Sequence, residues 1–394
     1  MKRRRCVAGR GGRSIRCAGL KCSFESATEV TEIEMKAWEL REFGAQHLHL
    51  VERPIPKVNP DEILVQVSAV ALNYRDKVVV DGVYLPTLLM PFTPGSDAVG
   101  IVVEAGNAVT RFRVGDRVIA HYRRKWLDGD PGPEEITACV GAPLPGVLAE
   151  YVVLPESGAV AAPSCLDDLE SSTLPIAALT AWFALFEDGQ LRPGDWVLVE
   201  GTGGVSLFSL QFAGAMGARV VITSRSDDKL QRAKALGASA GVNYRQTADW
   251  DKAVLDITGG KGAACVIETA GGTSLQRSIN ALSAGGRIEL IGFLEAVQAS
   301  INVLSMVRKR AQIRAVAVGH RRAFEKMNCA LETLHIKPVI DTVYDFLQLP
   351  QAFQHLERGG FGKLVIRLSS TSPGVQAGHG ACDCLLPGRC NGTC

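Results

Sequence analysis

The residues best suited to chemistry are three glycines, Gly201, Gly203 and Gly204, which follow the apolar run Trp196–Val199. A short run of this kind is typical of a buried parallel strand. The glycines allow a sharp turn, and the small residues from Val205 onward begin a predicted helix. A strand that turns into a helix N-terminus presents unpaired backbone N–H groups and the positive end of the helix dipole. The stretch therefore predicts a binding site for an anion such as a pyrophosphate.

The spacing of the turn is close to the dinucleotide-binding pattern G-x-G-x-x-G but has Ser206 at the third glycine position. Serine is still small enough for the helix to pack closely on the strand. A second apolar run, Arg219–Thr223, follows at the distance expected of a βαβ unit. An ordinary glycine turn of an α/β protein is the alternative, but the context favours a dinucleotide site.

The end of that second run indicates which dinucleotide is bound. Ser224, Arg225 and Lys229 offer one hydroxyl and two cations, which suit the 2′-phosphate of NADPH. An acidic residue there would instead accept hydrogen bonds from the ribose hydroxyls of NADH. Asp227 and Asp228 are close by, but they are expected in the first turn of the next helix, where acids commonly lie. We therefore predict NADPH (NADP+) as the cofactor.

The composition sets the frame for these residues. The chain has 394 residues, 46% of them hydrophobic, and a formal net charge of +2. This length suits two domains, each with its own core. A near-neutral charge gives no reason to expect nucleic acid or a membrane surface as a partner. We expect a small-molecule substrate.

The two ends of the chain differ from its body. Up to Phe24 there are eight Lys or Arg residues and no acid, so residues 1–34 are expected to be a disordered or targeting extension. A transit peptide would place the protein in the mitochondrial matrix; otherwise we expect a cytoplasmic protein, with Met35 as a candidate initiator. Seven of the eleven cysteines lie within the first 24 or the last 13 residues, which indicates no disulfide framework and favours a reducing compartment. Residues 371–394 are expected to be a disordered Cys-rich tail.

The pattern between the ends predicts an α/β protein with two domains. From Met35, short strands punctuated by turns, one of them expected over Leu148–Leu154, indicate a partly closed β-barrel domain over 35–174, rejoined by 320–370. Residues 175–319 alternate strands and helices, which predicts a Rossmann domain with a doubly wound parallel sheet. The strands expected after the second run are Ala264–Glu268, Arg287–Ile291 and Ile313–Val318. A single helix is expected over Pro175–Leu185.

Several short stretches resemble the medium-chain dehydrogenase/reductase superfamily over roughly Met35 to Leu368. They are Met35–Trp38, Asn73–Asp76, Pro94–Gly100, Arg113–Val118, Leu179–Trp182, the glycine turn and Phe361–Lys363. The chain looks most like the zinc-free, quinone-oxidoreductase-like branch, whose members are often called zinc-type alcohol dehydrogenase-like. The resemblance implies a GroES-like first domain.

The zinc members of that superfamily have a Cys, a Gly-His-Glu motif and a second Cys as landmarks. The corresponding stretches here carry Asn73–Tyr74, Gly95–Asp97 and Pro175–Ala177. A catalytic zinc needs about three protein ligands of N, S or O type. Tyr122–Val147 contains only Cys139, so the four-cysteine structural lobe is missing as well. We expect no bound metal.

Two residues are candidates for the chemical step. Tyr84 lies in a Gly-x-Tyr stretch similar to that of enoyl reductases in the superfamily, which implies a proton donor or a group that polarises the substrate. Packing at a loop is the alternative role. Asn73 could orient the nicotinamide ribose or the substrate carbonyl, or it could cap a turn.

The resemblance also implies further cofactor contacts. Thr180 is expected at the phosphates or ribose, Tyr244 near the 2′-phosphate, and Lys363 beside the cofactor. The remaining contacts are expected at the ends of later strands, namely Thr269, Gly271, Gly292, Phe293 and Val318.

We therefore expect a zinc-independent, NADPH-dependent oxidoreductase that reduces an activated double bond or a quinone by hydride transfer. A zinc-free alcohol or carbonyl oxidoreductase and a non-catalytic NADPH-binding protein remain as alternatives. The strand over Ile313–Val318 is expected at an open sheet edge, which favours a homodimer.

Overall fold

The computed structural model describes residues 34–368. The predicted tail over 371–394 lies outside these residues, as does all of the predicted N-terminal extension except Glu34, which begins the first strand. None of the helices within the described range is long and apolar enough to cross a membrane.

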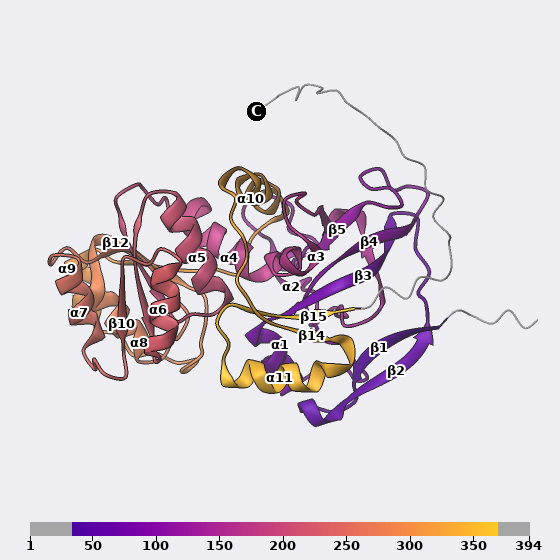
Figure 1. Cartoon of the computed structure of the whole chain (residues 1–394), viewed down its shortest axis with the longest axis horizontal. Coiled ribbons are helices and arrows are strands. Elements are labelled where there is room, and N and C mark those ends of the chain that lie inside the picture. Colours follow the sequence, from indigo (N-terminus) through magenta and orange to yellow (C-terminus); the bar gives the residue numbers. More distant parts are fainter. Residues whose placement is uncertain (1–33, 369–394) are drawn as a thin grey trace, which may run out of the picture. The chain divides into compact units, whose positions relative to one another are not determined.

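A six-stranded, all-parallel sheet forms one half of the fold. Its strands are β8 (Trp196–Glu200), β9 (Arg219–Ser224), β10 (Ala240–Asn243), β11 (Ala263–Glu268), β12 (Leu282–Leu290) and β13 (Gln312–Ala315). Their order, β10-β9-β8-β11-β12-β13, is the Rossmann order, with the switch point between β8 and β11. The helices between them are α5 (Gly204–Ala215), α6 (Asp227–Ala235), α7 (Trp250–Ile257), α8 (Ser274–Ala281) and α9 (Val303–Lys309), at the left of Figure 1. The predicted fold class is confirmed.

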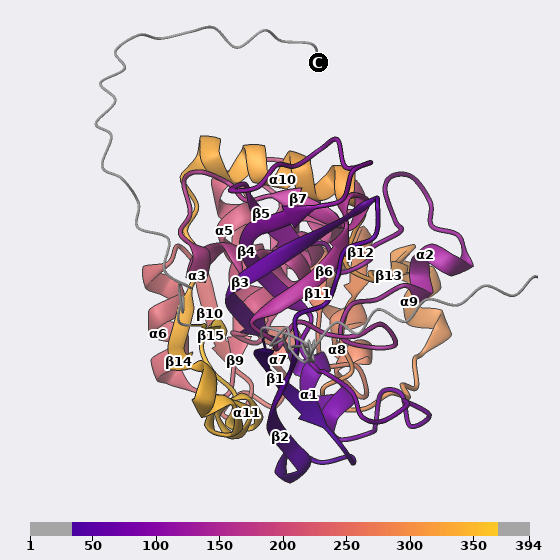
Figure 2. The same ribbon diagram turned by 90° about the vertical axis from the view of Figure 1, so that its right-hand side faces the viewer.

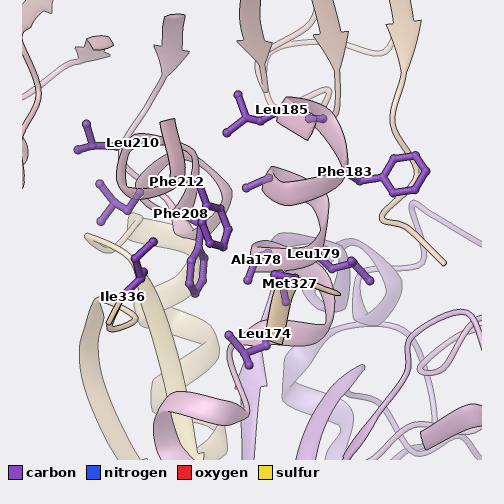
Figure 3. Packing of buried hydrophobic residues seen from close by; sticks show 14 of the residues in the cluster. Leu174, Ala178, Leu179, Phe183, Leu185, Phe208, Leu210, Phe212, Met327 and Ile336 are labelled. Carbon is purple, nitrogen blue, oxygen red and sulfur yellow. The ribbon is translucent and has the colours of Figure 1, made fainter. Parts of the chain in front are cut away.

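The first strand and helix of this sheet are held by a shared apolar core. Val197, Leu198 and Val199 of β8 are fully buried. Phe208 and Phe212 of α5 stack with ring centroids 5.9 Å apart, and they face the helical segment around Leu179 (Figure 3). Glycine at 217, with φ +81°, allows the chain to turn back after α5. Burial of these side chains therefore fixes where the glycine turn lies.

The second half is a GroES-like β-domain, seen around β3, β4 and β5 at the right of Figure 1. Its seven-stranded sheet contains β3 (Glu62–Leu72), β4 (Asp97–Ala105), β5 (Arg117–Ala120), β6 (Tyr151–Pro155), β7 (Ala159–Ala161), β14 (Ile340–Asp345) and β15 (Lys363–Arg367). A separate pair joins β1 (Glu34–Leu40) to β2 (Leu48–Pro54). The last strand, β15, lies antiparallel beside β3, with Leu364 opposite Leu72. The chain thus returns to its first domain after leaving the Rossmann sheet.

Short helices complete this half. They are α1 (Tyr74–Val80), α2 (Pro133–Thr137), α3 (Asp168–Ser171), α10 (Arg321–Leu334) and α11 (Leu349–Arg358). Figure 2 shows α10 and α11 at opposite ends of the β-domain. The 3-10 turns are η1 (Ala45–His47), η2 (Glu156–Gly158) and η5 (Phe346–Gln348).

Three predicted segments differ from the observed ones. The helix expected over Pro175–Leu185 consists of a π turn η3 (Leu174–Ala178), an α turn α4 (Leu179–Trp182) and a second π turn η4 (Phe183–Glu187). The strand expected to reach Val318 ends at Ala315, because Val318 has φ +71°, which no strand residue adopts. The strand expected from Leu148 begins only at Tyr151, since the backbone of Leu148 bonds to Trp38 and Pro94 instead.

Candidate functional site

The glycine turn has the geometry of an anion site. Gly201 has φ +74°, and Gly203 is the N-cap of α5 with extended backbone. A Cβ placed on Gly203 would meet no described atom within 4 Å, so the space in front of the helix N-terminus is open. Ser206, at the third position of the pattern, is buried and donates its hydroxyl to the Glu200 carbonyl at 2.7 Å. The serine is therefore a packing residue whose buried hydroxyl is hydrogen-bonded. A glycine at this position would have no hydroxyl to satisfy.

Gly204 is required for a different reason. A Cβ on Gly204 would lie 2.7 Å from Lys363 Cδ and 3.1 Å from Ala177 Cβ. The neighbouring backbone is joined as well, since Gly362 N donates to Thr202 O at 3.0 Å. Glycine at position 204 thus makes room for the lysine side chain, and the Phe361–Lys363 turn is attached directly to the glycine turn.

Lys363 reaches a buried polar group formed with Asn73 and Asp97. Its Nζ lies 2.6 Å from Asn73 Oδ1 and 3.4 Å from Asp97 Oδ2, and Asn73 Nδ2 donates to the same Asp97 oxygen at 2.8 Å. Burial raises the pKa of Asp97 to about 6, although the charge of Lys363 opposes this rise. Burial also lowers the pKa of Lys363 from its usual value, against the attraction of Asp97. The site therefore holds an ammonium group at the positions that correspond to zinc-ligand motifs in the resembled family.

Asn73 caps a turn, which is one of the two roles expected for it, and its side chain joins the buried polar group. Its backbone N–H donates to Asp76 Oδ2 at 2.8 Å and so caps α1. Its amide, meanwhile, is held by Lys363 and Asp97. The structure places this side chain beside Lys363, and hence close to the glycine turn.

Tyr84 lies on an exposed loop after α1 with 44% of its surface accessible. The guanidinium of Arg75 lies 5.3 Å from its ring centroid. The sequence prediction did not single out Arg75, although the residue belongs to the Asn73–Asp76 stretch that carried the resemblance. A cation two residues after Asn73 was the available signal.

Cations gather after β9, where the 2′-phosphate contacts were predicted. Arg225 Nη2 donates to Arg358 O at 2.8 Å, and Lys229 Nζ donates to Gly359 O and Gly360 O at 3.1 and 2.9 Å. Burial and the nearby charge of Arg225 lower the pKa of Lys229. Arg232, which the prediction missed, stacks on the Phe361 ring at 3.9 Å. These three cations, which we call the β9 cation group, hold the 358–361 loop by its carbonyls and its aromatic ring.

The other predicted cofactor residues occupy several environments. Ser224 is buried, and its carbonyl accepts from Tyr244 N at 3.1 Å, while the Tyr244 side chain is exposed. Thr180 on α4 is 2% exposed and Val318 is also buried, so both need a small movement or a backbone contact to reach a ligand. Thr269, Gly271, Gly292 and Phe293 follow β11 and β12, and Phe293 is 37% exposed.

Two carboxyl groups that the prediction missed lie at the switch point. Glu200 ends β8 and Glu268 ends β11, and both are buried. Ser278 Oγ lies 2.9 Å from Glu200 Oε1 and 2.5 Å from Glu268 Oε2. One hydroxyl has a single hydrogen, so the second contact requires a carboxyl O–H as donor. Burial and the neighbouring Glu268 raise the pKa of Glu200 well above its usual value, in agreement with one shared proton.

This carboxyl pair positions the loop after β11. Glu268 Oε1 accepts from Ala270 N and Gly271 N at 2.9 and 3.0 Å. Glu200 Oε1 accepts from Ser274 Oγ at 2.8 Å. Hydrogen bonds to two side chains at the ends of the adjacent strands β8 and β11 thus hold the loop that carries Thr269 and Gly271.

No group of three or more His, Cys, Asp or Glu residues within 34–368 is arranged to hold a metal ion. The residues suit a dinucleotide better: an open helix N-terminus, a buried ammonium beside it and a cation group at the end of the second strand. The Rossmann sheet has this glycine turn, and it is joined to a GroES-like domain whose last strand begins beside the turn. Together they define a two-domain oxidoreductase class that uses a nicotinamide cofactor.

Comparisons with known proteins agree with this class. Residues 59–164 match the alcohol dehydrogenase GroES-like domain, and residues 204–335 match the zinc-binding dehydrogenase family. A zinc-type alcohol dehydrogenase-like protein of Schizosaccharomyces pombe is 40% identical over 82% of this chain and 96% of its own length. The quinone oxidoreductase of Sus scrofa is 29% identical over 80% of this chain and 91% of its own length.

A solved structure supports the same assignment. The crystal structure of an NAD-dependent alcohol dehydrogenase has a TM-score of 0.76 and 33% identity, with 85% of this chain and 100% of that chain covered. The chain belongs to the medium-chain dehydrogenase/reductase superfamily. It is an oxidoreductase of this superfamily, whose members use nicotinamide cofactors and act on small molecules.

Proposed function

We propose that this protein is a zinc-independent, NADPH-dependent reductase of activated double bonds or quinones. The observation that carries the cofactor preference is the β9 cation group. Arg225 and Lys229 are held close together at the end of β9 by carbonyls of the 358–361 loop. A 2′-phosphate is a better acceptor than a neutral carbonyl, because it adds charge to each hydrogen bond. These donors can therefore turn from the loop to the phosphate.

The zinc-independent part of the proposal rests on Lys363. The ammonium contacts Asn73 and Asp97, and Asn73 and Asp97 occupy two of the three stretches where zinc members of the family have their ligands. Asn73 Oδ1 is a weak metal ligand compared with a thiolate or imidazole. A positive charge is already present, so a divalent cation would have to displace Lys363 from a buried position.

NADPH, when bound, supplies a hydride. The residues of this chain then orient the substrate and donate the proton. Lys363 and the N-terminus of α5 provide positive potential for the pyrophosphate. The Tyr84 hydroxyl, on the exposed loop after α1, donates the proton that completes reduction of the substrate.

A panel of substrates tests the proposal. Purified protein should reduce quinones or enones with NADPH faster than it oxidises simple alcohols with NADP+, and it should do so after treatment with a chelator. Tyr84→Phe should lower kcat by roughly 10- to 1,000-fold, the range for one acid or oxyanion donor. Alcohol oxidation as the dominant activity would favour the alternative, a zinc-free alcohol or carbonyl oxidoreductase like the NAD-dependent alcohol dehydrogenase neighbour. NADPH binding without any turnover would indicate a non-catalytic protein.

Cofactor preference has its own matched pair of variants. Arg225→Asp should raise the Kd for NADPH at least tenfold and change that for NADH far less, because a charge-assisted pair becomes a like-charge contact. Arg219→Asp makes the same charge change at the opposite end of β9, where Arg219 stacks on Trp196, and should leave NADPH binding nearly unchanged. Equal affinity of the wild-type protein for NADH and NADPH would contradict the assignment.

We also propose a homodimer formed through β13. This strand is the last in the order of the parallel sheet, so its outer edge is unpaired within the described residues. The neighbouring α9 exposes Val303 and Val307, with 68% and 66% of their surfaces accessible. An open strand beside exposed apolar side chains favours association with a second copy. Val307→Glu should convert the dimer to a monomer in sedimentation experiments, and a monomeric wild-type protein at micromolar concentration would contradict this assignment.

A further inference from the structure

The guanidinium group of Arg75 lies close to the phenol ring of Tyr84. Its guanidinium lies 5.3 Å from the Tyr84 ring centroid and 5.0 Å from that of Tyr122, so it lies between two aromatic rings. Only 12% of the Arg75 side chain is exposed, whereas Tyr84 is 44% exposed. Cations within about 6 Å of an aromatic ring are attracted to it, and more strongly when they are shielded from water. The Tyr84 ring is therefore partly exposed to solvent and has a shielded positive charge beside it.

The position of this guanidinium is fixed by several acceptors. Nη1 donates to Ser96 Oγ and to Val140 O and Gly141 O, the latter two at 3.3 Å, and Nη2 donates to Ala142 O at 3.2 Å. Asp76 Oδ1 lies 3.6 Å from Nη1 and supplies the counter-charge. Acceptors from three separate parts of the β-domain thus hold one planar group. Arg75 cannot follow Tyr84 if the loop moves, so it acts as a fixed support.

The same acceptors connect Arg75 to the cofactor side of the site. Ser96 Oγ donates to Asp76 Oδ1 at 2.6 Å, and Asp76 Oδ2 accepts from Asn73 N at 2.8 Å. Asn73 in turn contacts Lys363. Two buried acids, Asp76 and Asp97, are thereby balanced by two cations, Arg75 and Lys363. The chain of contacts runs from the Tyr84 ring to the glycine turn.

We propose that Arg75 is a positioning residue for Tyr84, which orients the ring and stabilises the phenolate that forms when the hydroxyl gives up its proton. The proposal rests on the proposed function of Tyr84 and extends it. In the step concerned, the substrate gains a hydride at one carbon and the Tyr84 O–H bond breaks as its proton passes to the resulting enolate. The phenolate then recovers a proton from water. The charge of Arg75 attracts the phenolate more strongly than it attracts the neutral ring, so it favours the transition state over the resting enzyme.

A double-mutant cycle with Tyr84→Phe tests this inference. Arg75→Met removes the charge and should lower kcat about 10- to 100-fold. Arg75→Lys keeps the charge without the planar group and should recover part of the lost rate. In the Tyr84→Phe background, Arg75→Met should lower kcat by less than about threefold more, because both changes remove the same function.

Arg123 provides the matched control. It also lies over the Tyr122 ring, at 5.5 Å, and bonds to backbone carbonyls, but it does not contact Tyr84. Arg123→Met and Tyr84→Phe should therefore have multiplicative effects on kcat. Multiplicative effects of Arg75→Met and Tyr84→Phe, or a kcat in a folded Arg75→Lys variant no higher than that of Arg75→Met, would overturn the role of Arg75. An unchanged kcat in Tyr84→Phe alone would instead refute the proposed function of Tyr84.

Discussion

The buried pair of Lys363 and Asp97 gives a prediction whose size can be worked out from the structure. Burial raises the pKa of Asp97 from 3.8 to about 6, so the folded state favours its neutral form. The stability contributed by this group is present below pH 4 and is lost as the pH rises through about 6. The difference between the two pKa values corresponds to about 3 kcal/mol.

Lys363→Met removes the ammonium group, whose attraction to the Asp97 carboxylate limits the stability lost when Asp97 ionises. Without it, the pKa of Asp97 rises further, because the attraction of Lys363 is one of the causes that lower it. Each pH unit above 6 should then cost the variant about 1.4 kcal/mol more than the wild-type protein, until Asp97 ionises. The gap in unfolding free energy should be small at pH 5 and reach about 3 kcal/mol at pH 8, two pH units above the pKa of Asp97 and at the low end of the usual cost of breaking a buried pair.

Urea unfolding between pH 5 and 8 measures this gap. The control is the same substitution in an Asp97→Asn background, where position 97 has no carboxylate and the gap should vary far less with pH. A gap that is equal at pH 5 and pH 8 in the Asp97 protein would refute the coupling. The variant should fold at pH 5.5 even if it does not fold at pH 8.

Three further outcomes are expected. Gly204→Ala should destabilise the protein by about 1–3 kcal/mol, because the new Cβ would lie 2.7 Å from Lys363 Cδ, whereas Gly203→Ala has open space and should cost less than about 1 kcal/mol in the same urea experiment. Burial raises the pKa of Glu289 to about 7, so wild-type stability should fall as the pH rises from about 4.5 through 7. Glu289→Gln should remove up to about 3 kcal/mol of that fall in thermal or urea unfolding measured from pH 4 to 8, and a parallel pH dependence in both proteins would contradict it.

The fold and the glycine turn could be predicted because they depend on local patterns. The apolar run at Trp196–Val199, the glycines after it and the second run at Arg219–Thr223 each follow a short-range rule. Lys363 was placed near the cofactor only by resemblance, and its contact with Asn73 joins residues 290 positions apart. No periodicity in either segment indicates that their side chains meet. Contacts of this kind depend on how the two domains pack, which the sequence pattern does not specify.

The pair Glu200 and Glu268 was missed although a signal existed. Glu268 is the last residue of a predicted strand and Glu200 directly follows one, and each is followed by a turn that contains glycine. The order of a Rossmann sheet places those two strands side by side, so their final residues were expected to be neighbours. What the pattern could not give is the protonation state, because that depends on complete burial and on the single hydroxyl of Ser278.

That shared proton has a consequence for how the site can change during evolution. The junction needs one donor and one acceptor at the ends of β8 and β11, and a glutamine provides the donor permanently. Exchange of either Glu200 or Glu268 for Gln therefore preserves the hydrogen bonds and relieves the need to bind a proton. Exchange of both removes the charge that holds the Gly271 loop, and a shorter Asp at either position does not reach Ser278. Either single exchange of glutamate for glutamine should therefore be tolerated at this junction, whereas the double exchange should not. Among related chains, glutamine should thus be found at one of the two positions but not at both.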